Sequence, residues 1–391
     1  MKKKIEEIEP VPDLPSKVAT PSLALQWAKK YLQNLNNDFS RVEDNQEMLH
    51  LKDVVSQAGR EQTAQKLMKS LRTVSHQAWN KVETLLSQEM ERHQIEPNLI
   101  NPWEITADSF KIYEKTLEVY TKQAPLRQLA MVMRLARQGE PLYQKALEIY
   151  TEQVAPSQLA AVIGAEVGAL RKKYTKDDPR VIGFVSMQFH YTSFLLLQTL
   201  STSESIIIPA YFKVIDDHLY MPLQRAYDAA AEHDYDSPAL AAVQNLLPVS
   251  TEISRKISQR IIELYPSYRS HSGLLSDPEV KTSSIRDIEM FQVYLWLCTL
   301  EGSVAAIQQE LFPLCVMLYP TFNVQWELIR QMLHLLGQEI QSRLSAKQAD
   351  TLMPYFQVLW QMFSPEVFGE LDLQRRSTRV EDDDFMKSLF A

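Results

Sequence analysis

Glycine is scarce in this chain, and its scarcity restricts the possible folds more than any other feature of the sequence. Only 9 of the 391 residues are glycine, about 2%, against a usual level of about 7%. Glycine supplies the positive-φ turns and close backbone approaches that tight hairpins, Rossmann crossovers and phosphate loops need. The 20 prolines fall mostly between apolar-periodic stretches, where connections between helices are expected. The sequence therefore predicts an all-α protein.

The composition is that of an ordinary globular chain. Its length allows two or three domains with a sizeable core. The net charge of −8 argues against a broad phosphate-backbone binder. The N-terminus, MKKKIEEIEP, lacks the apolar segment of a secretory signal, and no run approaches the roughly 18 apolar residues of a membrane span. Cys298 and Cys315 lie in apolar surroundings and are expected to be buried thiols in a reducing compartment. We therefore expect a cytoplasmic protein without membrane insertion.

The pattern of apolar and polar residues divides the chain into five parts. Residues 1–20 are charged and proline-spaced, which indicates a mobile N-terminal arm. An N-terminal helical hairpin is expected over 21–100, a duplicated helix-turn-helix repeat over 101–175, and a larger C-terminal helical domain over 176–370. Residues 371–391 are polar and charge-segregated, which predicts a flexible tether that ends in a short acidic and aromatic motif.

A long amphipathic helix is predicted from Glu61 to His93. At 1.5 Å per residue it would be roughly 50 Å long. An intramolecular helix hairpin would cover its apolar seam, and the near-heptad spacing also fits a coiled-coil homodimer through 61–93. The seam residues recur at spacings of mostly three and four: Leu67, Leu71, Val74, Ala78, Val82, Leu85 and Met90.

An internal repeat supports helical stacking. The segment YEKTLEVYTKQAPLRQLAMVM begins at Tyr113, and the similar segment YQKALEIYTEQVAPSQLAAVI begins at Tyr143. So many matches at one offset indicate a duplicated helix-turn-helix unit, whose copies bury their apolar faces against each other. The stretch KALEIY resembles the second helix of a tetratricopeptide repeat, and this resemblance implies stacked helices.

Catalytic and metal-binding motifs are sparse. The carboxylate pair Asp216–Asp217 lies in an apolar helix but lacks the further acids of a magnesium motif, so we expect it on a solvated face beside a helix bend at Pro222. GxSxG, HExxH and a glycine-rich phosphate loop are all absent from the sequence. The eight histidines form no metal-ligand spacing: His50, His76, His93, His190, His218, His233, His271 and His334. We therefore expect no metal, no cofactor and no enzymatic activity.

Two alternatives to a simple interaction protein stay open. One is an all-α enzyme or small-ligand sensor with a pocket in residues 180–340, and the candidate pocket residues are Phe189, His190, Tyr191, Tyr211, Asp217, His218 and Trp296. The other is a nucleic-acid-associated regulator that uses basic clusters at Lys2–Lys4, Arg171–Lys173 and Arg375–Arg379. None of these clusters is interleaved with aromatic residues, so solvated helix ends are the expected role and nucleic-acid binding is disfavoured.

The C-terminal sequence VEDDDFMKSLFA offers a docking motif. In a helix its apolar residues would share one face, and the preceding acids would lie at the positive end of the helix dipole. Such a short helix forms only when its face enters an apolar groove, in a partner or on the chain itself. The partner-binding residues are therefore predicted to be Asp382, Asp383, Asp384, Phe385, Met386, Leu389 and Phe390, with Ser377 and Thr378 as phosphorylation sites beside them.

These observations together predict stacked helical hairpins and repeats, a larger C-terminal helical domain and a flexible tail. The expected function is that of a non-catalytic cytoplasmic adaptor or regulatory protein. It would bind other proteins through its helical surfaces and through the C-terminal motif.

Overall fold

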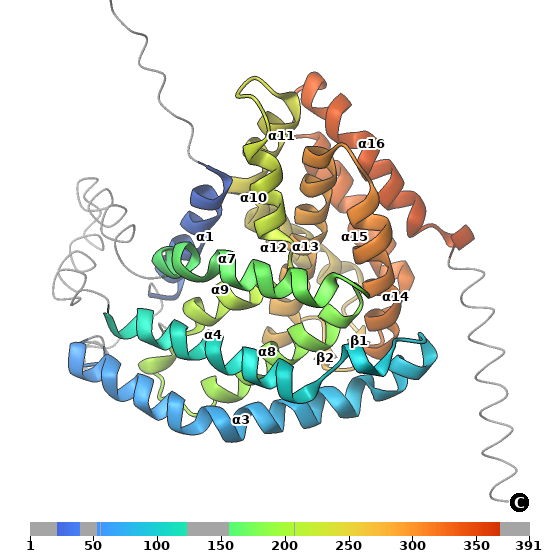
Figure 1. Ribbon diagram of the computed structural model, residues 1–391. Helices are drawn as coiled ribbons and strands as arrows, with labels where there is room; N and C mark the ends of the chain where they lie inside the picture. The colour runs from blue at the N-terminus through green and yellow to red at the C-terminus, as the bar shows by residue number, and fades with distance from the viewer. Residues whose placement is uncertain (1–21, 40–52, 55, 123–155, 207, 368–391) are drawn as a thin grey trace, which may run out of the picture.

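The structure, a computed structural model, describes residues 22–39, 53–54, 56–122, 156–206 and 208–367 (Figure 1). The all-α prediction is confirmed, because these residues are helical almost throughout. The exception in this part of the chain is a small antiparallel hairpin, β1 (Arg269–Ser270) and β2 (Gly273–Leu274).

The N-terminal half contributes six helices to the described part. They are α1 (Leu23–Phe39), α3 (Gln57–Arg92), α4 (Pro102–Lys122), α7 (Pro156–Thr175), α8 (Val181–Leu197) and α9 (Ile208–Tyr220), with 3₁₀ turns at Pro97–Leu99 (η1) and Glu204–Ile206 (η2). The hydroxyl of Ser22 accepts a hydrogen bond from the backbone N–H of Leu25 at 3.3 Å, as expected of an N-cap.

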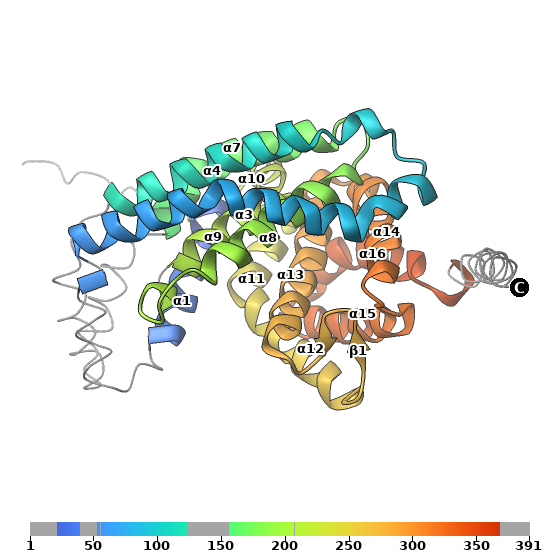
Figure 2. The ribbon, with the colours of Figure 1, turned by 90° about the horizontal axis from the view of Figure 1, so that it is seen from below.

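The C-terminal half begins directly after α9. Its elements are α10 (Leu223–Ala231), α11 (Pro238–Leu246), η3 (Leu247–Val249), α12 (Ser250–Leu264), the hairpin, α13 (Pro278–Glu301), a π-helical turn η4 (Ile307–Leu311), α14 (Phe312–Thr321), α15 (Trp326–Gln341) and α16 (Ala346–Met362). Figures 1 and 2 show α3, α4 and α7 lying across one face of the molecule, with α8 and α9 between them and the C-terminal helices.

The long helix predicted at 61–93 is present as α3, and its apolar seam is covered within the chain. Seam residues such as Leu67, Leu71 and Val82 are fully buried, and α3 packs against α4 and α8. A homodimer through this helix stays a prediction. It would have to use the outer face of α3, because the seam is already occupied.

Helix α13 forms the centre of the C-terminal half. Its residues from Ile288 to Leu300 are buried without interruption, which is the pattern of a helix surrounded by others. It packs against α10, α12 and α16. Cys298 on α13 and Cys315 on α14 are buried free thiols, as expected.

The helix expected to bend at Pro222 instead ends there, and α9 and α10 are separate helices. Proline has no N–H to continue the hydrogen-bond ladder, and the N–H of Leu223 donates to Met221 rather than to Leu219. The carbonyls of Leu219 and Tyr220 accept hydrogen bonds from the Arg171 guanidinium at 2.6 and 3.0 Å. The side chain of Arg171, which lies on α7, thus donates hydrogen bonds to two carbonyls at the end of α9 that have no partner within the helix.

Several predictions on the chain's organisation concern residues beyond this description. The second copy of the repeat, from Tyr143, and the segments 1–20 and 371–391 lie outside the described residues. The proposed domain boundaries stay predictions. No helix in the described ranges has the length and apolar character that crossing a membrane requires.

Candidate functional site

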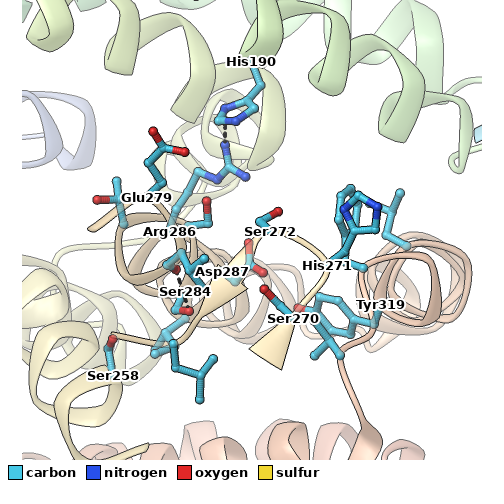
Figure 3. Close-up of a pocket in the computed structure, with 18 of the residues that line it drawn as sticks. His190, Ser258, Ser270, His271, Ser272, Glu279, Ser284, Arg286, Asp287 and Tyr319 are labelled. Atoms are coloured by element: carbon cyan, nitrogen blue, oxygen red, sulfur yellow. Dashed lines mark hydrogen bonds between the residues drawn. The ribbon is translucent and has the colours of Figure 1, made fainter. Parts of the chain in front are cut away.

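A cavity of about 720 Å³ lies within the C-terminal part of the fold, where it meets α8 and α9. Residues of α8 and α9 form one side, and the hairpin, α12, α13, α14 and α15 form the other (Figure 3). The volume is in the range of small-molecule sites, about 300–1,000 Å³. This cavity is the strongest candidate site in the described part of the chain.

Most of the cavity wall is apolar. Helix periodicity turns one face of α12 and one face of α15 inward, and the hairpin adds Leu275. The apolar wall includes Met187, Leu219, Ile261, Leu275, Leu328 and Met332. Such a wall favours a ligand that is largely apolar.

The hairpin at the cavity edge is held by long-range hydrogen bonds. Gly273 has φ +140°, a conformation that residues with a side chain rarely adopt. The hydroxyl of Tyr268 donates to the carbonyl of Asn323 at 2.7 Å and accepts from the N–H of Gln325 at 2.8 Å. The N–H of His271 donates to the carbonyl of Phe322 at 2.9 Å. The hairpin is thereby fixed to the connection between α14 and α15.

Charged and polar groups gather at one end of the cavity, around Arg286 of α13. Figure 3 shows His190 of α8 reaching toward this arginine, whose Nη1 donates to His190 Nδ1 at 3.3 Å. The guanidinium carbon lies 4.5 Å from the ring centroid of Tyr220, within cation–π range. Asp216 Oδ2 lies 3.8 Å from His190 Nδ1.

The neighbouring carboxyl, Asp287, has its own hydrogen-bond donor. The Tyr220 hydroxyl donates to Asp287 Oδ1 at 3.0 Å. Burial raises the pKa of Asp287, and the guanidinium of Arg286 opposes that rise. Asp287 therefore loses its proton less readily than an exposed aspartate does. Its carboxyl group already accepts a hydrogen bond from Tyr220.

Several buried polar atoms at the cavity wall have no hydrogen-bond partner within the described residues. They include Nε of Arg286, Oδ1 of Asp216 and Oγ of Ser258, and all three residues line the cavity. Ser258 is only 2% exposed. A buried polar atom without a partner costs free energy, so these three residues give the cavity wall polar groups whose hydrogen bonds are incomplete.

A second polar cluster, the buried charge cluster, consists of Lys30, Lys213, Asp217 and Glu289. Lys30 Nζ lies 3.0 Å from Glu289 Oε1, and Lys213 Nζ lies 2.9 Å from Asp217 Oδ1 and 3.6 Å from Glu289 Oε2. Burial alone would raise the pKa of Glu289, but the two ammonium groups hold it at about 2. Burial lowers the pKa of Lys30, against the attraction of Glu289. Two cations and two anions thus tie α1, α9 and α13 together.

Only two of the seven candidate pocket residues, His190 and Tyr191, line the cavity. The ring of Phe189 stacks on Tyr113 at 5.8 Å, that of Tyr211 meets Tyr120 at 5.2 Å, and that of Trp296 meets Trp27 at 6.1 Å. These three are core residues.

The remaining two candidates, Asp217 and His218, are also buried away from the cavity. The expectation that Asp217 is solvated is wrong, since it is 1% exposed and paired with Lys213. Burial lowers the pKa of His218 to about 4, opposed by a hydrogen bond with the carbonyl of Val214. His218 is therefore neutral near pH 7.

The basic cluster at Arg171–Lys173 is not simply a solvated helix end. Arg171 is buried, and besides capping α9 it donates to the Tyr294 hydroxyl at 2.6 Å. Glu310 of the π-helical turn lies 3.4 Å from Arg171 and also pairs with Arg225. The other two basic clusters lie outside the described residues.

The sequence reading missed Arg286 and Ser258. Arg286 and Asp287 form a charged pair directly before the longest buried run of α13. A charged pair at the start of an apolar run was the sequence signal that could have identified Arg286. Ser258 gave no signal, because its burial depends on packing. The predicted docking residues 382–390 and the phosphorylation sites lie outside the described residues. Among the described residues, no group of three or more His, Cys, Asp or Glu is placed to hold a metal ion.

Comparison with known proteins gives one partial match. A family model described as "Phycobilisome protein" matches residues 222–362, which is less than half of the chain. The matched segment runs from the start of α10 to the end of α16. It contains the hairpin and the α12–α15 wall of the cavity but not α8 or α9. No curated protein and no solved structure matches the chain.

Proposed function

We propose that this protein binds a small organic ligand in the cavity and acts as a non-catalytic, ligand-responsive regulatory protein. The observation that carries the proposal is the cavity of about 720 Å³, mostly apolar and with buried polar atoms that lack partners. Apolar walls with a few convergent polar groups are the usual composition of a small-molecule site.

The position of the cavity supports a regulatory role. Its wall combines α8 and α9 with helices of the segment that resembles phycobilisome proteins. A ligand that contacts both sides stabilises their association by its binding free energy. The partial match favours a context related to light harvesting.

A fluorescent apolar probe tests ligand binding. 1-Aminoanthracene should bind the purified protein with a dissociation constant on the order of 10 µM, seen as increased and blue-shifted emission. Replacing Ile262, which lines the cavity from α12, with tryptophan fills part of the space and should weaken binding at least tenfold.

The matched control is Ile262→Leu, which conserves volume and should keep the probe affinity within about twofold. Thermal unfolding of both variants checks that the fold persists. Absence of probe binding to the wild type, or equal binding to the tryptophan variant, would contradict the proposal.

Adaptor activity through the C-terminal motif is a second candidate function. It is favoured by the acidic and apolar sequence at 382–390. Burying four apolar side chains contributes on the order of 6–8 kcal/mol before ordering costs, which leaves a micromolar affinity as the expectation.

Deleting residues 380–391 tests the adaptor proposal. The melting temperature should be nearly unchanged, while a protein partner captured by the full-length chain should be lost. A variant of full length with Phe385, Leu389 and Phe390 replaced by serine should lose the same partner, which separates the motif from chain length. A large fall in melting temperature would instead indicate that the motif packs on its own chain.

A further inference from the structure

The two unpartnered charged groups of the cavity lie on neighbouring walls. Nε of Arg286 comes from α13 and Oδ1 of Asp216 comes from α9, and neither has a hydrogen-bond partner among the described residues. His190 lies between them: its Nδ1 accepts from Arg286 at 3.3 Å and is 3.8 Å from Asp216 Oδ2. Arg286 and Asp216 thus both belong to the wall of the same cavity.

Arg286 has no carboxylate within ion-pair distance among the described residues, although Asp287, Asp216 and Asp217 attract it from farther away. None of the ion pairs found within the described part of the chain includes it, and Asp287 beside it accepts from Tyr220 instead. The Tyr220 ring under the guanidinium contributes a cation–π contact, but a ring does not neutralise the charge. A buried guanidinium is most stable against a carboxylate, which can accept two hydrogen bonds from it.

Asp216 sets a complementary requirement. Its Oδ1 is buried and accepts no hydrogen bond from the described residues, and the carboxylate lines the cavity, where a ligand N–H or O–H can donate to it. A ligand that carried only an anionic group would satisfy Arg286 and leave Asp216 without a donor. The two groups therefore favour a head group that has an anion and a donor within a few bonds of each other.

The rest of the cavity determines the chemistry of the part of the ligand that lies away from Arg286 and Asp216. Ser258 lies on α12, away from Arg286 in Figure 3, and its buried hydroxyl can bond to one polar atom there. The wall between these points is largely apolar. The lining carries two basic side chains, Lys81 and Arg286, and three acidic ones, Asp216, Glu279 and Asp287. Net charge therefore does not select an anionic ligand, and hydrogen-bond geometry does.

We infer that the cavity takes an amphipathic organic acid whose carboxylate binds Arg286, whose adjacent N–H donates to Asp216, and whose apolar body lies along α12, α15 and the hairpin. This inference rests on the proposed function and specifies its ligand class. Neither a simple fatty acid nor a neutral alcohol satisfies both charged groups.

Displacement of 1-aminoanthracene by three probes that share a ten-carbon chain tests the ligand class. N-decanoylglycine has both the carboxylate and the N–H, decanoate has only the carboxylate, and decanol has neither. N-decanoylglycine should bind about tenfold or more tightly than decanol, with decanoate between them. Arg286→Gln should weaken both acids about tenfold or more and leave decanol within about twofold, whereas Arg286→Lys should retain part of the affinity for the acids.

Asp216→Leu removes both acceptor oxygens and should remove most of the advantage of N-decanoylglycine over decanoate. Affinity ratios between probes are measured within each variant, so a fraction of unfolded protein does not affect them. If 1-aminoanthracene binds but the three probes compete equally, or Arg286→Gln weakens all three alike, the ligand class is wrong and the cavity function stands. If 1-aminoanthracene does not bind the wild type at all, the cavity function itself fails.

Discussion

Replacing Glu289 with glutamine should lower the free energy of unfolding by about 3–5 kcal/mol, the usual cost of breaking a buried ion pair on one side. Glu289 is 2% exposed and faces the ammonium groups of Lys30 and Lys213. The amide keeps the shape of the side chain but leaves Lys30, itself 5% exposed, without its anion. Chemical denaturation with urea at pH 7 measures the loss.

A surface pair provides the control for this substitution. Glu118→Gln removes an acid whose partner, Lys122, lies one turn away on exposed α4, and the unfolding free energy should not change measurably. Replacing Lys30 with methionine in the Glu289→Gln background should recover part of the loss, because the unpaired cation is then gone. A loss below about 1 kcal/mol for Glu289→Gln would show that water reaches the buried charge cluster.

The same residue predicts a pH dependence. The pKa of Glu289 is about 2 in the folded chain, against 4.5 ordinarily, so the folded state favours the charged form. Its contribution is complete above pH 4.5 and is lost as the pH falls toward 2. The stability difference between the wild type and Glu289→Gln should therefore shrink as the pH is lowered below about 4.5.

Replacing Phe363 with alanine should also cost about 3–5 kcal/mol of unfolding free energy. Phe363 follows the last residue of α16 and is fully buried. Its ring centroid lies 5.6 Å from that of Phe291 on α13, 5.4 Å from that of Phe312 on α14 and 6.2 Å from that of Trp326 on α15. Truncation leaves a void among three helices and loosens the attachment of α16.

Trp103→Ala is the matched control for this aromatic truncation. Trp103 is 85% exposed on α4, so its removal creates no cavity and should change stability by less than about 0.5 kcal/mol. Equal losses for Phe363→Ala and Trp103→Ala would contradict the role given to the aromatic cluster.

Local patterns were sufficient to predict the all-α class and most of the helices. The segment that became α13 is apolar on most sides, and only a helix covered by neighbours accommodates that pattern. The segment now α8 was consistent with either a strand or a helix, because a short apolar run does not distinguish them. Its helical state depends on contacts with α3 and α9, which lie far away in the sequence.

The site was harder to predict than the fold. His190, Asp216 and Arg286 come together from three helices, separated by up to 96 residues. Nothing in the local sequence of His190 and Asp216 distinguishes them from Asp217 and His218, which are buried elsewhere. The hairpin at the cavity edge depends on Gly273 and on hydrogen bonds to residues some fifty positions away, and such bonds cannot be read from spacing.

The contacts of Arg171 restrict where residues can be inserted into this chain or deleted from it. Its guanidinium holds the last carbonyls of α9, directly before the point where the resemblance to phycobilisome proteins begins, and also reaches Tyr294 inside the resembling segment. An inserted or deleted residue in the connection between α9 and α10 would shift those carbonyls away from the buried guanidinium of Arg171. Natural variation in length should therefore accumulate in other connections and spare the one where the matched segment begins.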